Sequence, residues 1–217
     1  MWHHGHSHSV APETRGHTIR WGRVYDPFVK LWTVGQAPKM RQRTVALAQL
    51  QVGERVLDVG CGTGELTLCA KEAVGATGYV CGTDAAPEMI EVACRKVKEK
   101  GLEVDFQVDL IEKISFPDAS FDVVLSSLMM HHLPPDVKRA GLAEIYRVLK
   151  PGGRVVVVDF KHPTSKMGRL LMMPLLHHAL THGIQSLPPL MEEARLTKVD
   201  TGDLAFWVLG FARAQKA

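Results

Sequence analysis

The residues from Val56 to Gly64 limit most strongly what this chain can fold into. The run VLDV has the composition of a strand, and glycine follows at positions 60, 62 and 64. Beyond the glycines, apolar residues recur at helical spacing; they are Leu66, Cys69, Ala70 and Ala73. The pattern predicts a strand that enters a helix through a tight loop, the unit from which open α/β sheets are built.

Alternating glycines let a ligand lie almost against the backbone, because glycine has no Cβ and tolerates positive φ. Dinucleotides and S-adenosylmethionine are the two ligand classes that use such loops. The dinucleotide fingerprint G-x-G-x-x-G would need glycine where this chain has Glu65, whose carboxylate does not suit a pyrophosphate. A ligand without phosphates fits better, and Asp84 can accept hydrogen bonds from both hydroxyls of a ribose. A turn that uses glycine for steric reasons alone is the alternative.

Four segments, VLDVGCGTG, GTD, SFDVVLSS and EIYRVLKPGGRVVVVD, resemble the ordered motifs of class I S-adenosylmethionine-dependent methyltransferases. The resemblance is to the branch that contains the ubiquinone/menaquinone C-methyltransferases, and it covers residues 53–160 strongly and the flanks weakly. It implies a three-layer, Rossmann-like α/β fold with a mostly parallel seven-stranded sheet and N-terminal capping helices. Seven candidate strands in the sequence agree with that count.

The resemblance also implies which residues hold S-adenosylmethionine and its product, S-adenosylhomocysteine. Met89 corresponds to a residue along the adenine face, Asp109 to an acceptor for the exocyclic amine, and the N–H of Leu110 to a contact with the ring. Leu110 stands where the family often has a small residue, and a larger side chain there would narrow the pocket. The full predicted cofactor set is Asp58, Gly60, Gly62, Gly64, Asp84, Met89, Asp109, Leu110 and Ser126.

The fourth predicted strand covers residues 121–126. The loop that follows it should face the methyl acceptor, because ligands of open parallel sheets bind beyond the carboxyl ends of the strands. Its proton-handling groups are His131 and His132. An unperturbed histidine pKa of about 6.5 suits general-base work, although one of the two could only cap the next helix. In the resembled family a Tyr-Asp pair precedes a helix that closes over the cofactor. Tyr25 and Asp26 match that pair, and Tyr25 is the third catalytic candidate.

The N-terminal region should form helices. Four aromatic residues fall at spacings of 4, 3 and 4, on one helical face that either closes the site or packs on the sheet: Trp21, Tyr25, Phe28 and Trp32. Asp26-Pro27 is typical of an N-cap and first turn, so we expect two short helices that meet at Asp26, the second ending at Gly35. A further helix should cover residues 40–50.

After the glycine loop, the helix that begins at Pro87 should bury the stripe Ile90, Ala93, Cys94 and Val97, with Met89 off it. Strands are expected over 104–108 and 154–160. An antiparallel pair near 196–200 and 206–212 should close the sheet.

The length of 217 residues fits a single domain. We expect a disordered His-rich tail over 1–17 and a methyltransferase domain over 18–217, with cap helices over 18–50 and a substrate-side insertion over 161–186. No Cys, Asp or Glu stands among the first four histidines of the tail, so we predict no metal. The four cysteines show no C-x-x-C pairing and should be reduced packing residues. With no apolar run near about 18 residues and no apolar signal core, we expect a soluble, cytoplasmic protein.

Charge is unevenly distributed. Residues 15–43 carry seven Lys or Arg against Asp26 alone, whereas the net charge of the whole chain is +3. Residues 161–191 contain no acid and include the run LLMMPLL. Both segments should lie over the carboxyl edge of the sheet, where they favour contact with an anionic membrane surface on the inner membrane face. A solvated helix face and a closed lid over a small soluble acceptor are the alternatives. We expect no nucleic-acid partner.

Together these features predict an S-adenosylmethionine-dependent methyltransferase that acts on an apolar or lipid-like acceptor, such as a quinone precursor or a phospholipid amine head group. Methylation of a soluble natural product or metabolite is one alternative. A catalytically silent, cofactor-binding partner subunit is another, because the sequence specifies the cofactor pocket better than the acceptor site. Glu65 disfavours a dinucleotide oxidoreductase.

Overall fold

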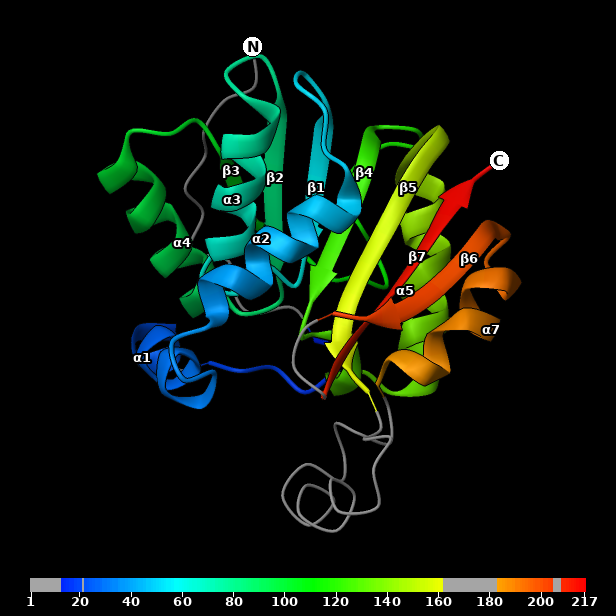
Figure 1. The fold of residues 1–217 in the computed structure, drawn as a ribbon, viewed down its shortest axis with the longest axis horizontal. Helices are drawn as coiled ribbons and strands as arrows, with labels where there is room; N and C mark the ends of the chain where they lie inside the picture. Colours follow the sequence, from blue (N-terminus) through cyan, green and yellow to red (C-terminus); the bar gives the residue numbers. More distant parts are fainter. Residues whose placement is uncertain (1–12, 21, 162–182, 205–207) are drawn as a thin grey trace, which may run out of the picture.

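The computed structural model describes residues 13–20, 22–161, 183–204 and 208–217. Its centre is a seven-stranded sheet with the strand order β3-β2-β1-β4-β5-β7-β6 (Figure 1). The strands are β1 Arg55–Val59, β2 Tyr79–Asp84, β3 Asp105–Val108, β4 Phe121–Ser127, β5 Leu149–Phe160, β6 Leu196–Asp203 and β7 Leu209–Lys216. Neighbours among β1 to β5 pair in parallel, and β7 runs antiparallel to both β5 and β6. The predicted α/β fold with a mostly parallel seven-stranded sheet is confirmed.

Helices cover both faces of this sheet. They are α1 Gly22–Trp32, α2 Ala37–Ala48, α3 Glu65–Val74, α4 Pro87–Lys100, α5 Pro135–Val148 and α7 Leu187–Glu193, with short 3-10 turns over Met130–His132 and Ile184–Ser186. On one face α2 and α3 bury Ala48 and Ala70 against β1 and β4, and on the other α5 and α7 bury Ile145 and Met191. The four valines of β5 are at most 1% exposed, as expected for a central strand covered on both sides. The result is a three-layer domain.

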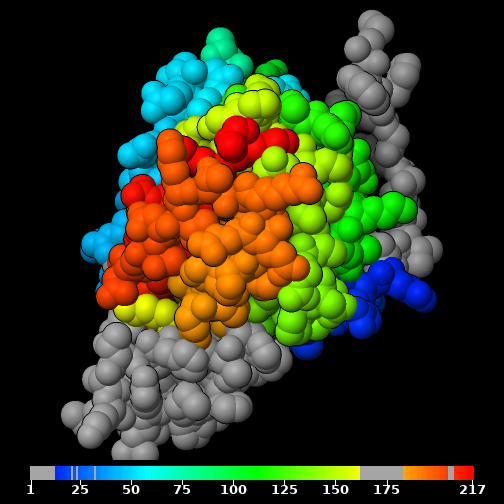
Figure 2. Space-filling view, turned by 90° about the vertical axis from the view of Figure 1, so that its right-hand side faces the viewer, coloured from blue at the N-terminus to red at the C-terminus, as the bar shows by residue number. Residues whose placement is uncertain are grey.

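The C-terminal strand pair closes one edge of the sheet. Figure 2 shows this side of the molecule, where α7 and β6 in orange lie next to β7 in red. β6 extends three residues beyond the predicted 196–200, and β7 begins at Leu209 and continues to Lys216 instead of ending at 212. Phe206, with which the predicted strand began, lies outside the described residues.

The N-terminal helices differ from the prediction. A single helix, α1, runs through Pro27, and α2 begins at Ala37, with proline in its first turn. Asp26 does not cap a second helix, because its carboxylate accepts a hydrogen bond from Thr63 Oγ1 at 2.6 Å and pairs with Lys96. The expectation of two helices meeting at Asp26 is therefore wrong: a long-range contact, not a local cap, uses this side chain.

The buried stripe of α4 is also shifted from the predicted one. Met89, Ile90, Val92 and Ala93 are buried, whereas Cys94 is exposed and Val97 is half-buried. The prediction that Cys94 packs in the core and that Met89 is off the buried face is therefore wrong. The first turn of α4 is covered by α1 as well as by the sheet. The two helices are in close contact, since a Cβ on Gly22 of α1 would lie 2.8 Å from the Glu88 carbonyl oxygen. All four cysteines are free thiols.

Several segments about which the sequence makes predictions are not among the described residues. Residues 1–12 of the His-rich tail, Trp21, and residues 162–182 of the insertion with its leucine-methionine run lie outside the described residues. Among the residues that are described, no helix is both long and apolar enough to cross a membrane.

Candidate active site

The carboxyl ends of β1 and β4 meet at the middle of the sheet, where the strand order reverses. Ligands of open α/β sheets bind at such a switch point. A pocket lies there, and its wall includes most of the predicted site residues: Tyr25, Asp58, Gly60, Gly62, Asp84, Met89, Asp109, Leu110 and His132. Gly64, Ser126 and His131 are not part of this wall. Ser127 lines it in place of Ser126, whose side chain points to the opposite face because neighbours in a strand alternate.

The three glycines of the loop after β1 have different reasons to be glycine. All have positive φ, of 72°, 55° and 80° along the chain. A Cβ at Gly60 would lie 2.3 Å from Met129 Cγ, and one at Gly64 would lie 2.7 Å from Phe106 Cζ. A Cβ at Gly62 would meet nothing nearer than Tyr25 Cε1, at 3.8 Å. Packing thus explains Gly60 and Gly64, whereas Gly62 leaves space that opens into the pocket.

Asp58 is the buried acid at the inner end of the pocket. Its Oδ2 accepts a hydrogen bond from Thr67 Oγ1 at 2.6 Å, while Oδ1 is buried and has no partner among the described residues. Burial, partly offset by the Thr67 hydrogen bond, raises the pKa of Asp58 to about 7. A buried acceptor without a partner is costly, so this oxygen is suited to a cationic ligand group or an ordered water.

Asp84 stands at the end of β2, opposite the glycine loop. Its two carboxylate oxygens accept hydrogen bonds from the backbone N–H groups of Gly62 and Ala86, each at 2.9 Å. Burial raises the pKa of this carboxyl, and the two N–H donors oppose the rise. Each oxygen keeps a second lone pair, so the carboxylate can hold the loop and still accept from a ligand.

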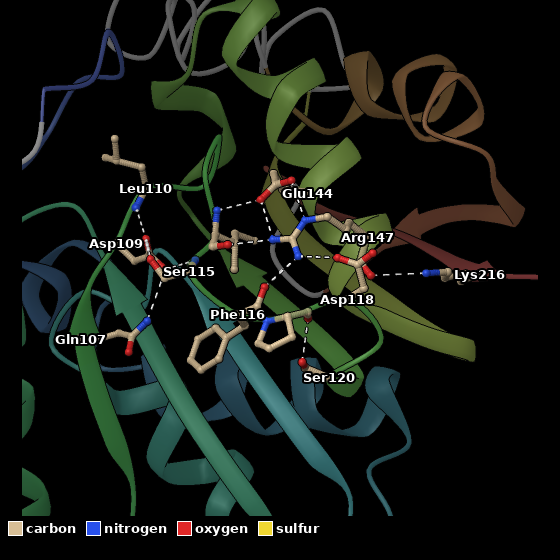
Figure 3. A network of polar contacts seen from close by, with 12 residues as sticks. Gln107, Asp109, Leu110, Ser115, Phe116, Asp118, Ser120, Glu144, Arg147 and Lys216 are labelled. Carbon is tan, nitrogen blue, oxygen red and sulfur yellow. Dashed lines mark hydrogen bonds and ion pairs between the residues drawn. The ribbon is translucent and has the colours of Figure 1, made fainter. Parts of the chain in front are cut away.

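Asp109 follows β3 and holds the next loop in place. Its carboxylate accepts from Ser115 N–H at 2.8 Å, from Ser115 Oγ and Leu110 N–H at 3.0 Å, and from Gln107 Nε2 at 3.3 Å (Figure 3). These four donors match the acceptor capacity of a carboxylate. A ligand amine could bind Asp109 only by replacing one of them, so the role that the structure shows is that of a loop anchor.

Arg147 of α5 clamps the same loop from its far side. Its guanidinium donates to the carbonyl oxygens of Ile114 and Phe116, both at 2.7 Å, and pairs with Glu144 and Asp118 (Figure 3). The Arg147 hydrogen bond is the largest influence on the pKa of Glu144 and lowers it. The loop that carries Leu110 into the pocket is thus fixed at both ends by charged hydrogen bonds.

The two histidines after β4 have different surroundings. His131 is buried. Its backbone N–H donates a hydrogen bond to the Asp159 carboxylate at 2.9 Å, and its Nδ1 lies 2.6 Å from the other oxygen of that carboxylate. His132 is half-buried and lines the pocket, with its ring 3.9 Å from that of His131 between centroids. The structure therefore places His132 in contact with the pocket and His131 behind it, as a support for the loop. The loop is also strained at Leu128, a pocket residue with φ of 55°.

Helix α1 closes another side of the pocket. Tyr25 and Val29, one turn apart, line it. Burial is the largest cause that raises the pKa of the Tyr25 hydroxyl, followed by the nearby Asp84 carboxylate, so this hydroxyl stays protonated and can donate. Phe28, predicted to share the face of Tyr25, is half exposed instead. Trp32 belongs to the helix, but its side chain lies outside the described part of the chain.

Sequence reasoning missed the segment before α1. Residues 13–17, included in the predicted disordered tail, instead lie across the pocket. Thr14 Oγ1 donates to Glu112 at 2.7 Å, Arg15 pairs with Asp136, and the N–H of His17 donates to the His132 carbonyl at 3.1 Å. Because these partners are about a hundred residues away, no local sequence signal could have found them.

Comparison with known proteins assigns the chain to a family. Residues 56–153 match the family described as a methyltransferase domain. A demethylmenaquinone methyltransferase of Thermus thermophilus is 41% identical over 140 residues, 64% of this chain and 62% of that protein. A second one, from Geobacillus sp., is 36% identical over 168 residues, 72% of this chain and 70% of that protein. The chain belongs to the S-adenosylmethionine-dependent methyltransferases.

Solved structures agree with this assignment at the level of the fold. A SAM-dependent methyltransferase from Aquifex aeolicus superposes with a TM-score of 0.67 at 23% identity, covering 82% of this chain and 89% of that chain. At this identity the likeness shows the fold alone. The chain spans less than two thirds of the length of the Thermus relative.

The residues present fit S-adenosylmethionine. The unpartnered Asp58 Oδ1 suits its ammonium group, directly or through a water, and Asp84 suits its ribose hydroxyls. Gly62 leaves room for the ligand beside the backbone, and Met89 and Leu110 line the part of the pocket toward β3 and α4. Among the described residues, no group of three or more metal-ligating side chains comes together.

Proposed function

We propose that this methyltransferase transfers a methyl group from S-adenosylmethionine to an apolar, lipid-like acceptor, and that the acceptor is a quinone precursor. One observation carries the proposal: the pocket that holds the unpartnered Asp58 Oδ1 at its inner end also has a group of apolar side chains in its wall. That wall includes Ile19, Val29, Leu128, Met129 and Leu133. The names of the two relatives, both demethylmenaquinone methyltransferases, support the same acceptor class.

When bound, S-adenosylmethionine supplies an electrophilic methyl on its sulfonium sulfur. The residues of the chain therefore have to orient the acceptor and exclude water, which can lower a barrier by several kcal/mol. The segment 13–19 and α1 cover the pocket and would keep water out. An acceptor of this class also loses a proton, and His132 is the candidate base. Tyr25, whose raised pKa keeps it protonated, would donate a hydrogen bond to an acceptor oxygen.

The test is methyl transfer from labelled S-adenosylmethionine to a short-chain, reduced demethylmenaquinone in detergent. A phospholipid amine and a polar, soluble catechol serve as competing acceptors. We expect methylation of the quinol; labelling of the catechol alone would contradict the apolar acceptor. Binding of S-adenosylhomocysteine without transfer to any acceptor would instead indicate a silent, cofactor-binding subunit.

His132→Gln and Tyr25→Phe separate the two roles. Loss of a base should lower kcat at least about a hundredfold while leaving the affinity for S-adenosylhomocysteine within about threefold. The Tyr25→Phe variant should raise the KM of the acceptor more than it lowers kcat. Full activity of His132→Gln would exclude this residue as the base.

A further inference from the structure

Helix α1 has two apolar faces. Tyr25 and Val29 point to the pocket, and a second stripe points away from it. That stripe consists of Val24, Phe28 and Leu31, at spacings of one and two turns, continued by Val34 in the turn after the helix. Their exposed fractions are 55%, 50%, 80% and 85%. We call these four residues the outer ridge.

The outer ridge is unusual for this protein. Among the described residues, five large apolar side chains are exposed, and the ridge contains four of them; the fifth is Val52. A stripe of this kind on one helix marks an interaction surface more often than a scattered exposed residue does. The ridge is also adjacent to the active site, since α1 lies at the edge of the sheet toward which β4 and β5 point (Figure 1).

Val34 is held outward in an unfavourable backbone conformation. Its φ of 50° is rare for a β-branched residue. The turn around it is firmly bonded: the N–H of Gly35 donates to the Lys30 carbonyl at 2.7 Å, and Thr33 Oγ1 donates to the Val29 carbonyl at 2.7 Å. Strain of this kind persists where a surrounding structure enforces it, and it is concentrated at functional positions. Here it presents an apolar side chain to solvent.

The charged side chains that follow Asp26 on the chain segment of the outer ridge are all basic. Residues 27–53 contain Lys30, Lys39, Arg41 and Arg43 and no acid, and both lysines are exposed. The preceding acid, Asp26, is turned inward to Thr63 and Lys96. An apolar stripe bordered by exposed cations is complementary to an anionic lipid surface. A second copy of the chain would instead bring the same positive charges against it.

We propose that the outer ridge is the surface by which this protein docks on an anionic lipid bilayer. The apolar side chains would enter the level of the lipid head groups, while Lys30 and Lys39 remain near the phosphates. Docking through α1 would present the neighbouring pocket to the bilayer, from which a lipid-like acceptor comes. This use of docking rests on the proposed function, but the lipid-binding surface itself does not.

The experiment is cosedimentation of the full chain with vesicles, without any methyl acceptor. Vesicles of phosphatidylglycerol and phosphatidylcholine are compared with pure phosphatidylcholine at about 50 mM and about 500 mM salt. We expect binding to the anionic vesicles at low salt and its loss at high salt, because screening weakens exposed charge pairs. Equal binding to both vesicle types, or to neither, would overturn the proposal.

Two pairs of variants locate the surface. Leu31→Ser with Val34→Ser should weaken vesicle binding about tenfold or more, whereas Val52→Ser, an equally exposed valine before β1, should have no effect. Lys30→Gln with Lys39→Gln should weaken binding about thirtyfold, since each lysine near an anionic surface contributes about 1 kcal/mol. The exposed lysines at the end of α4 are the charge control, as Lys98→Gln with Lys100→Gln. Unchanged binding by the ridge variants would place the lipid contact elsewhere and refute the proposal.

Other measurements distinguish this proposal from the proposed function. The ridge variants should bind S-adenosylhomocysteine like the parent, since none of the four residues lines the pocket. They should also methylate a detergent-dispersed acceptor normally and lose only transfer to an acceptor embedded in vesicles. Vesicle binding without methylation of any lipid-like acceptor would refute the function and keep the surface. A parent dimer that dissociates in the Leu31/Val34 variant would show the ridge to be a self-association surface instead.

Discussion

The ionisation of Asp58 should control how tightly the cofactor binds. The residue is 1% exposed, and its pKa of about 7 means that the carboxyl is largely protonated in the free protein below neutral pH. The cofactor ammonium favours the ionised form, so binding below that pH must release a proton. At about 1.4 kcal/mol per pH unit, ionising Asp58 at pH 5 costs about 3 kcal/mol. The affinity should therefore be about a hundredfold lower at pH 5 than near pH 7.5.

The affinity should also fall at alkaline pH, because a free α-amino group loses its proton at a pKa of about 8. The stability of the free protein should follow the opposite trend below neutrality. A raised pKa means that the native state binds this proton more tightly than the unfolded state does. The contribution of Asp58 to stability is then fully present below the ordinary value of 3.8 and is lost as the pH rises to about 7.

Titration calorimetry with S-adenosylhomocysteine between pH 5 and pH 8.5 tests this account. Asp58→Asn should bind about ten- to a hundredfold more weakly at pH 7.5, where a charge-assisted contact is lost, and should converge with the parent at pH 5. Asp105→Asn, an exposed carboxyl at the start of β3, is the matched control. If Asp58→Asn keeps the parental pH dependence, the assignment of the ammonium to Asp58 is wrong.

Three further variants test other parts of the site. Asp84→Ala should weaken S-adenosylhomocysteine binding about a hundredfold or more, because it removes the ribose acceptor, and each charged hydrogen bond contributes roughly 1.5 to 3 kcal/mol. It should also lower the melting temperature, because the Gly62 N–H loses its acceptor. Parental affinity would refute the ribose assignment. Gly62→Val should abolish binding and cost about 1 to 3 kcal/mol of stability, because its φ is 55°; binding that survives would contradict the loop assignment. Arg147→Met should lower the free energy of unfolding in urea by about 2 to 3 kcal/mol, against at most about 1 for Arg139→Met at an exposed ion pair; equal effects would show that the Arg147 clamp adds nothing.

The fold around β1 was predictable because its determinants are local. Val56 to Gly64 combine an apolar strand with a turn in which three glycines supply positive φ values. The sequence could not show which of the three glycines is required for packing and which leaves space for a ligand. Gly60 and Gly64 face Met129 and Phe106, side chains more than forty residues away in the chain, and only the folded structure shows that Gly62 alone faces open space.

The less predictable parts depend on partners distant in sequence. His131 and His132 are equivalent candidates in the sequence, and Asp159 at the end of β5 distinguishes them by engaging His131. The strand β7 was placed too early because its buried face presents alanines, Ala212 and Ala214, which give only a weak alternating apolar signal. Local patterns therefore predicted the elements, and tertiary contacts decided which side chains reach the pocket.

Helix α1 shows how one tertiary contact can set two surfaces. Asp26 joins the helix to Thr63 at the glycine loop and to Lys96 on α4, and this fixes the rotation of the helix about its axis. Once Tyr25 faces the pocket, the advance of about 100° per residue turns Val24 and Leu31 about 100° or more away from it. Phe28 lies between the two sides. The basic charge that the sequence concentrates in residues 15–43 then borders an apolar ridge next to the site, because Asp26, the one acid in that range, is used inside. The pocket wall and the outer ridge are therefore consequences of the same anchoring contact.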